Sequence, residues 1–137
     1  MQDGVSFAAL DLESPDRFVS LRRALGVTSF GINFMLLRPG QQGRIHRHTS
    51  QEEVYVVIEG VLTLSIEGTE HQLRRGDVAR VAPDVRRRLM NRGTELCGVL
   101  ALGGHGEHVG RDGVAYESWD ATEGRPPQEI PLPDDLR

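Results

Sequence analysis

The chain has 137 residues, of which 38% are hydrophobic and 26% are charged, and its formal net charge at pH 7 is -4. This length fits one domain that can bury a core without disulfide bonds, and the single cysteine, Cys97, excludes an internal disulfide. The acidic balance argues against a nucleic-acid-binding protein. Because the sequence has neither an apolar N-terminal leader nor a long apolar run, we expect a cytoplasmic protein without a membrane segment.

The first thirty residues predict a short strand and one helix. The apolar stretch at residues 5–10 is typical of an edge strand. Ser14 can cap a helix, Pro15 fits its first position and Gly26 can end it, so we expect a helix at about 15–25. Its apolar face would consist of residues spaced by three and four positions: Phe18, Leu21 and Leu25.

From residue 30 onward the pattern changes to short apolar or alternating runs separated by turn residues. We expect strands at about 32–37, 43–48, 53–58, 61–66, 70–73, 78–81, 86–90 and 95–102. Many short strands with turn signals every eight to twelve residues, and no repeated helices, indicate an all-β sandwich or barrel. We therefore divide the chain into an N-terminal strand and helix (1–29), a barrel (30–102) and a C-terminal loop and tail (103–137).

Two histidines and a carboxylate form the clearest candidate site. His46 and His48 are two residues apart on an expected strand, so their side chains point to the same face. Glu53 begins the next strand and can return a carboxylate to that face. Nitrogen and oxygen donors together suit Fe, Mn, Zn, Ni or Cu better than Ca or Mg.

The spacing of these residues resembles that of a known family. Gly40, His46, His48, Glu53 and Gly60 match the first motif of the cupin superfamily at every fixed position. The resemblance is to small single-domain bacterial cupins. It implies a jelly-roll, or double-stranded β-helix, barrel that is often dimeric and has the motif residues facing inward.

The second cupin motif is degenerate. Gly76 opens it and Asn91 closes it at the right distance, but Ala82 and Asp84 stand where the family has proline and glycine. Arg87 stands where the resemblance implies a fourth metal ligand, a histidine. Arginine stays protonated and offers no lone pair to a metal.

Arg87 leaves three interpretations open. In the first, His46, His48 and Glu53 hold a metal and Arg87 anchors an anionic group of a bound ligand. A guanidinium about 5 Å from a dication is then opposed by roughly 7 kcal/mol at an effective dielectric of about 20, unless an anion bridges them. In the second, no metal binds and Arg87 pairs with Glu53. In the third, the barrel is kept only for its shape and the polar cluster is an internal network.

We expect the barrel to bind a divalent transition metal and a small organic molecule, anionic where Arg87 anchors it, in a partly apolar cavity. The substrate-binding residues would be Arg87 and Tyr55, and the cavity would be lined by Phe34, Leu36 and Tyr55. If the protein is an enzyme, oxygenase (including dioxygenase) or isomerase chemistry at the metal is expected. The competing hypothesis is a metal-free binding protein that catalyses no reaction.

The remaining polar candidates are assigned to the surface. Glu52 falls on the opposite strand face from Glu53 and is expected in solvent, as is His71. His105 and His108 lie in a glycine-rich loop and are expected to be exposed. Arg86 and Arg88 would face outward, where they can meet acidic groups of a second subunit.

Overall fold

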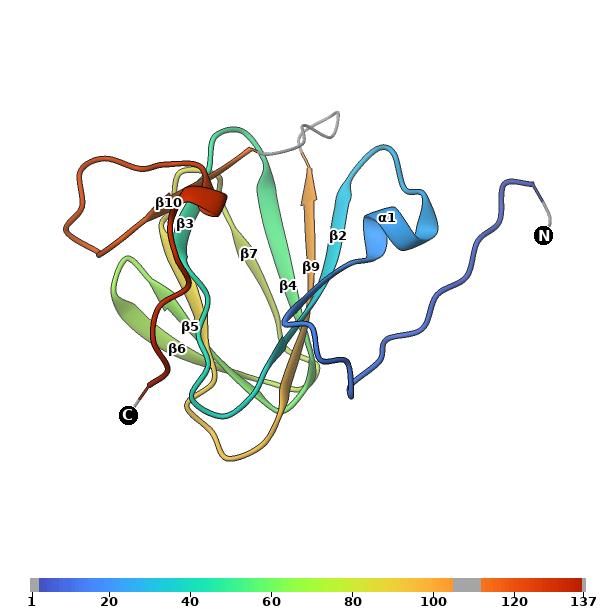
Figure 1. Cartoon of the computed structure of the whole chain (residues 1–137), viewed down its shortest axis with the longest axis horizontal. Coiled ribbons are helices and arrows are strands. Elements are labelled where there is room, and N and C mark those ends of the chain that lie inside the picture. The colour runs from blue at the N-terminus through green and yellow to red at the C-terminus, as the bar shows by residue number, and fades with distance from the viewer. Residues whose placement is uncertain (1–2, 105–111, 137) are drawn as a thin grey trace.

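The computed structural model describes residues 3–104 and 112–136 and consists of two five-stranded antiparallel sheets that face each other (Figure 1). The first sheet contains, in spatial order, β1 (Phe18–Ser20), β2 (Gly31–Leu37), β9 (Cys97–Gly104), β4 (Glu52–Glu59) and β7 (Val78–Val81). The second sheet contains β10 (Gly113–Tyr116), β3 (Ile45–His48), β8 (Arg87–Met90), β5 (Val61–Ile66) and β6 (Thr69–Arg74). The predicted all-β jelly-roll barrel is confirmed.

The space between the sheets is filled by alternate residues of their strands. On β4, Tyr55 and Val57 are buried in the main core, and on β9 Cys97, Val99 and Ala101 join them. Burial raises the pKa of the Cys97 thiol to about 12, so this residue is a small apolar core group, as its sequence context predicts.

The outer face of the first sheet is also apolar. Phe34 and Leu36 lie there, in a second cluster with Leu21, and do not line the interior. Their neighbours Met35 and Leu37 face the barrel interior instead. The expectation that Phe34 and Leu36 line the cavity was therefore wrong: every second residue of a strand shares a face, and both faces of β2 are apolar.

The N-terminal region differs from the predicted strand and helix. Residues 5–10 form no strand, and the only α-helix in the described part of the chain, α1, spans Leu21–Leu25. Its cap is Ser20, whose side chain accepts a hydrogen bond from the Arg23 amide, while Phe18 and Val19 pair with β2. Pairing with β2 holds these residues extended, so the predicted helix starts later. No helix in the described residues is long and apolar enough to span a membrane.

The C-terminal segment packs on the second sheet. β10 was not predicted as a strand; it pairs with β3, with Ala115 opposite His46 and Gly113 opposite His48. The segment continues through a 3-10 turn, η1 (Pro127–Glu129). Arg86 donates to the carbonyl oxygens of Trp119 and Ala121, so it contacts the tail of its own chain.

The tight turn at Gly60 leads to a stability prediction. Gly60 has φ +73°, and a Cβ there would overlap the backbone oxygen of Leu96; Gly68 has φ +89° with nothing within 4 Å. We expect Gly68→Ala to lower the free energy of unfolding by about 1 kcal/mol, because alanine is strained only by the left-handed backbone at this position. Gly60→Ala should lower the free energy of unfolding by about 1–3 kcal/mol more, because the backbone of Leu96 must move to make room for the Cβ. Urea unfolding of both variants measures this difference, and equal losses would contradict the prediction.

Candidate metal centre

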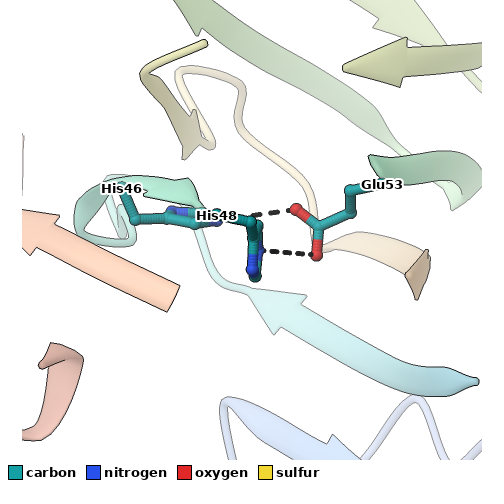
Figure 2. Close-up of side chains that lie close together, drawn as sticks. All are labelled: His46, His48 and Glu53. Atoms are coloured by element: carbon teal, nitrogen blue, oxygen red, sulfur yellow. Dashed lines mark ion pairs between the residues drawn. The ribbon is translucent and has the colours of Figure 1, made fainter. Parts of the chain in front are cut away.

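Two strands that follow each other in the chain but lie in different sheets bring the three predicted donors together. His46 and His48 are alternate residues of β3 and point to the interior of the barrel. Glu53 is the second residue of β4 and reaches them from the opposite sheet (Figure 2). The sequence motif therefore describes a site that bridges the two layers of the barrel.

The geometry of the cluster suits a metal ion. Glu53 Oε1 lies 3.6 Å from His46 Nε2, and Glu53 Oε2 lies 3.4 Å from His48 Nε2 (Figure 2). The centroids of the two imidazole rings are 5.4 Å apart, and the ring planes are nearly perpendicular. One donor atom from each residue lies within 4.8 Å of the others, which is close enough for all three to share one ion.

The far nitrogen of each ring faces an oxygen atom. His46 Nδ1 lies 3.2 Å from the carbonyl oxygen of Arg44, and His48 Nδ1 lies 3.8 Å from Asp112 Oδ2. A carbonyl or carboxylate at one ring nitrogen leaves the other with its lone pair toward the metal. Both ring nitrogens of His48 are buried without a hydrogen-bond partner in the described structure, so the residues present fit a metal at this point.

Arg87 is fully buried behind the carboxylate. It lies opposite His46 on the adjacent strand β8, and its Nη1 donates to the Val85 carbonyl at 2.6 Å. Its Nε donates to the Tyr55 hydroxyl at 3.3 Å, and its Nη2 lies 3.6 Å from Glu53 Oε1. Arg87 thus takes the place of the fourth ligand implied by the resemblance and contributes a fixed positive charge.

Tyr55 completes the support of Glu53. Its hydroxyl donates a hydrogen bond to Glu53 Oε1 while accepting one from Arg87. Burial and then the adjacent Glu53 charge raise the pKa of Tyr55 well above its usual value, so the phenol stays protonated. Tyr55 therefore acts here as a hydrogen-bond donor to the carboxylate.

Glu53 remains ionised although it is mostly buried. Burial alone would raise its pKa, but the imidazoles of His46 and His48 beside the carboxylate outweigh burial and hold the pKa well below the usual range. An ionised carboxylate between two imidazoles can act as a ligand without first losing a proton.

A cavity of about 330 Å³ opens beside the three donors. Its wall is mostly apolar, with a few polar side chains, and contains Phe18, Asn33, Met35, Leu37, Arg44, His46, His48, Glu53, Tyr55, Leu89, Ala101 and Pro127. Tyr55 is part of this wall, and its ligand-contacting role stays a prediction. Arg87 is not part of the wall, and its ligand-anchoring role stays a prediction.

The other polar candidates lie outside the cluster. Glu52 is exposed and bonds Arg80 at 2.7 Å on the outer surface, and His71 is exposed on β6. Arg86 and Arg88 face the outer side of the second sheet, although Arg86 contacts the chain's own tail. His105 and His108 lie outside the described residues.

Sequence reasoning missed two charged residues at the site. Asp112 precedes β10, and its carboxylate accepts the backbone amides of Ser50 and Gln51 at 2.9 and 2.8 Å besides facing His48. Arg44 lines the cavity and is held by the Ile130 carbonyl at 2.6 Å. No motif marks either residue. Asp112 meets β3 only through the pairing of β10. Arg44 lies two residues before His46, just ahead of β3, and this spacing is the one signal that could have placed it on the same face.

The contact between Asp112 and His48 gives a testable prediction. Asp112→Asn keeps an oxygen for the two backbone amides but removes the negative charge beside His48. We expect the affinity for a divalent metal to fall about 10–100-fold, as is usual when a group supporting a ligand histidine is lost. Chelator competition measures the affinity. Asp77→Asn, whose carboxylate accepts the amide of Arg74 in a distant turn, is the control and should bind as the wild type does.

Comparisons with known proteins agree with the fold and the motif. The family model of the cupin domain matches residues 33–103. Polyketide synthase CurC of Streptomyces cyaneus is 32% identical over 71 residues, which are 52% of this chain and 46% of that protein. Protein SchB of Streptomyces halstedii is 32% identical over 68 residues, 50% of this chain and 49% of that protein. The matches thus span about half the length of these curated relatives.

Solved structures with the same architecture cover most of the chain. A cupin protein from Bacteroides fragilis superposes with a TM-score of 0.67 at 21% identity, over 89% of this chain and 98% of that one. A sugar phosphate isomerase of the cupin superfamily from Silicibacter pomeroyi superposes with a TM-score of 0.65 at 26% identity, over 88% of each chain. These likenesses extend beyond the segment matched by the family model.

Proposed function

The chain belongs to the cupin domain family, and on this premise we propose that it holds a divalent transition metal at His46, His48 and Glu53 and binds a small organic molecule in the adjoining cavity. The observation that carries the proposal is the convergence of the three donors, with the buried nitrogens of His48 left without hydrogen-bond partners among the described residues. The donor set accepts Fe, Mn, Zn, Ni or Cu and leaves coordination positions open.

The lining of the cavity supports a particular class of ligand. Most of the wall is apolar, while Asn33 and Arg44 supply a few polar groups and Arg44 supplies a positive charge. A largely apolar molecule with an oxygen donor for the metal and one acidic group fits this wall. A sugar phosphate, with hydroxyls on every side, would leave most of its polar groups unpaired there. The identity with CurC also supports an oxygenated, polyketide-like compound rather than a sugar.

Each residue of such a site would have a distinct role. Glu53 and the two histidines hold the metal, which when bound supplies a Lewis acid or a site for O₂. Tyr55 and Arg87 fix the Glu53 carboxylate from behind, Arg44 pairs with the acidic group of the ligand, and the apolar wall excludes water. Isomerase and oxygenase chemistry are the reaction classes that we propose for this arrangement.

The contact between Arg87 and Glu53 favours a second candidate. Their 3.6 Å separation allows the guanidinium charge to balance the carboxylate without a metal, and the cavity would then serve a metal-free binding protein. The two candidates differ in what the unaltered cluster binds, because only the first needs an ion between the donors.

Metal titration of wild type and of Arg87→His separates the two candidates. We expect the chelator-stripped wild type to bind one Fe, Mn, Zn, Ni or Cu ion per chain in calorimetry. Arg87→His should bind more tightly, because it removes a positive charge and adds a donor. A wild type that binds none of these ions, under conditions where Arg87→His does, would establish the metal-free candidate instead.

The ligand class is tested on the same protein. Thermal shift with metal-loaded wild type should show stabilisation by hydroxylated aromatic acids and none by sugar phosphates, because a ligand that binds only the folded state raises the apparent melting temperature. The opposite pattern would contradict the proposed class while leaving the metal site standing.

A further inference from the structure

A second cavity lies between the strands of the second sheet and the C-terminal tail, residues 117–136. It has a volume of about 470 Å³, and its wall contains Arg44, Arg88, Tyr116, Glu117, Ile130, Pro131, Leu132, Pro133 and Asp134. We call it the tail cavity. Small-molecule sites usually measure about 300–1,000 Å³, so the tail cavity is large enough for a ligand of its own. None of the three proposed metal donors lines it.

The tail forms one wall of this cavity and is fixed to the barrel at two points. The carbonyl oxygen of Ile130 accepts a hydrogen bond from Arg44 Nε at 2.6 Å, and that of Asp134 accepts one from Gln42 Nε2 at 3.0 Å. The red C-terminal segment of Figure 1 is thereby held beside the strands. The tail cavity is therefore a preformed part of the fold.

Arg88 places a positive charge in the tail cavity. Its Nε atom is buried without a hydrogen-bond partner among the described residues, and no ion pair of the described chain includes Arg88. Burial lowers the pKa of Arg88, although arginine stays protonated at neutral pH. A partly buried guanidinium without a counter-charge is costly, and an anion in the cavity would remove this cost.

Two carboxylates line the same cavity. Glu117 and Asp134 are both exposed, and neither forms an ion pair with Arg44 or Arg88 in the described structure. Opposite charges that share a cavity without touching leave room for a molecule between them. Because the two positive and the two negative side chains balance, the wall is complementary to a molecule that carries both charges rather than to a simple anion.

Apolar groups form the rest of the wall. Ile130 is buried, Leu132 is 36% exposed, and prolines flank Leu132 on both sides. The Tyr116 hydroxyl is already bonded to Arg47 Nε at 2.8 Å, outside this cavity. A ligand with a short aliphatic or aromatic group can bury that group against this part of the wall.

We infer that the tail cavity binds a zwitterionic small molecule of the amino-acid type, with its carboxylate on Arg88 and its ammonium group toward Glu117 and Asp134. The apolar side chain of the ligand would contact Ile130 and Leu132. A guanidinium binds a carboxylate through two parallel hydrogen bonds, whereas the exposed acids contribute mainly charge. The inference does not depend on a metal in the barrel.

Calorimetric titration of the full chain tests the inference, with leucine, methionine and phenylalanine as probes for both metal-loaded and metal-stripped protein. We expect at least one of them to bind once per chain, with the same affinity in both forms. Its N-acetyl derivative, which lacks the ammonium group, should bind about threefold more weakly or worse. Its amide, which lacks the carboxylate, should bind about tenfold more weakly or worse.

Two outcomes of this titration would overturn the inference. The first is that none of the three amino acids binds, or that binding occurs only with metal present, which would place the probe at the metal centre. The second is that the N-acetyl derivative or inorganic phosphate binds as tightly as the free amino acid, which would make the cavity a site for simple anions.

Arg88→Gln should weaken the binding of the amino acid about ten- to a hundredfold, because it removes the charge and the paired hydrogen bonds. Arg74→Gln is the matched control. It removes the same charge from an exposed position on β6 of the same sheet, outside the tail cavity, and should bind as the wild type does. Circular dichroism shows whether both variants are folded. A folded Arg88→Gln with the affinity of the wild type would overturn the inference.

The exposed carboxylates provide a second test that leaves Arg88 in place. The double variant Glu117→Gln/Asp134→Asn should bind the free amino acid about threefold more weakly or worse, but should not weaken binding of the N-acetyl derivative. Asp120→Asn/Glu123→Gln changes two exposed acids of the tail that do not line the cavity, and it should have no effect. Equal losses in the two double variants would overturn the zwitterionic ligand.

Discussion

Replacing His48 by alanine is expected to remove stoichiometric metal binding from the proposed site. The variant keeps only His46 and Glu53, and two donors cannot hold a transition metal as three do. Loss of a group that merely supports a ligand costs about 10–100-fold in affinity, so loss of the ligand itself should exceed that range. Elemental analysis of the purified variant and calorimetric titration measure the effect.

His71→Ala is the control for this experiment. His71 is exposed on β6 and has no part in the cluster, so this variant should bind metal as the wild type does. The melting temperature of metal-free His48→Ala shows whether the barrel stays folded. Equal metal affinities for folded His48→Ala and wild type would place the metal elsewhere and remove the basis of the proposed centre.

Replacing Arg87 by methionine is expected to cause a large loss of stability in the metal-free protein. The guanidinium has no solvent exposure and balances the Glu53 carboxylate, whose side chain is 14% exposed. Removing one partner of a buried ion pair leaves an uncompensated charge and typically costs about 3–5 kcal/mol. The Val85 carbonyl also loses its donor. Urea unfolding at neutral pH measures the free energy of unfolding.

Arg80→Met offers a matched comparison, because Arg80 also pairs with a glutamate of β4 but at the surface. The Arg80→Met substitution should lower the free energy of unfolding by at most about 1 kcal/mol. Adding Glu53→Gln to Arg87→Met should recover part of the loss, since the unpaired charge disappears. Saturating metal should likewise reduce the cost of Arg87→Met, because the ion then balances Glu53. A loss no larger than that of Arg80→Met would show that Arg87 does not stabilise the carboxylate.

The donor cluster could be predicted because its geometry is local. His46 and His48 are on one strand, where alternation alone places both on one face, and Glu53 is separated from them by a single turn. The position of Arg87 beside them also followed from the spacing of the second motif. What the sequence left undecided was whether Arg87 points at the ligand or at Glu53, because that depends on the packing of Val85 and Tyr55 around it.

The parts that were missed depend on pairing between distant segments. Asp112 meets His48 only because β10 lies beside β3, and a weakly patterned stretch gives no hint of that pairing. The sequence of β2 does not show which of its two faces points into the barrel, since Phe34 and Met35 are equally suitable for a core. The predicted helix failed because strand pairing with β2 competed with helix capping at Ser14.

The origin of the three donors has a mechanical consequence. Two come from β3 in one sheet and one comes from β4 in the other, and no covalent bond joins the sheets apart from the chain itself. An ion at this point would act as a removable cross-link between the two layers. Amide hydrogens of β3 and β4 should then exchange with solvent more slowly when the ion is present, because separating the sheets first requires releasing it. Metal supply would thereby set how long the barrel survives as well as what it binds.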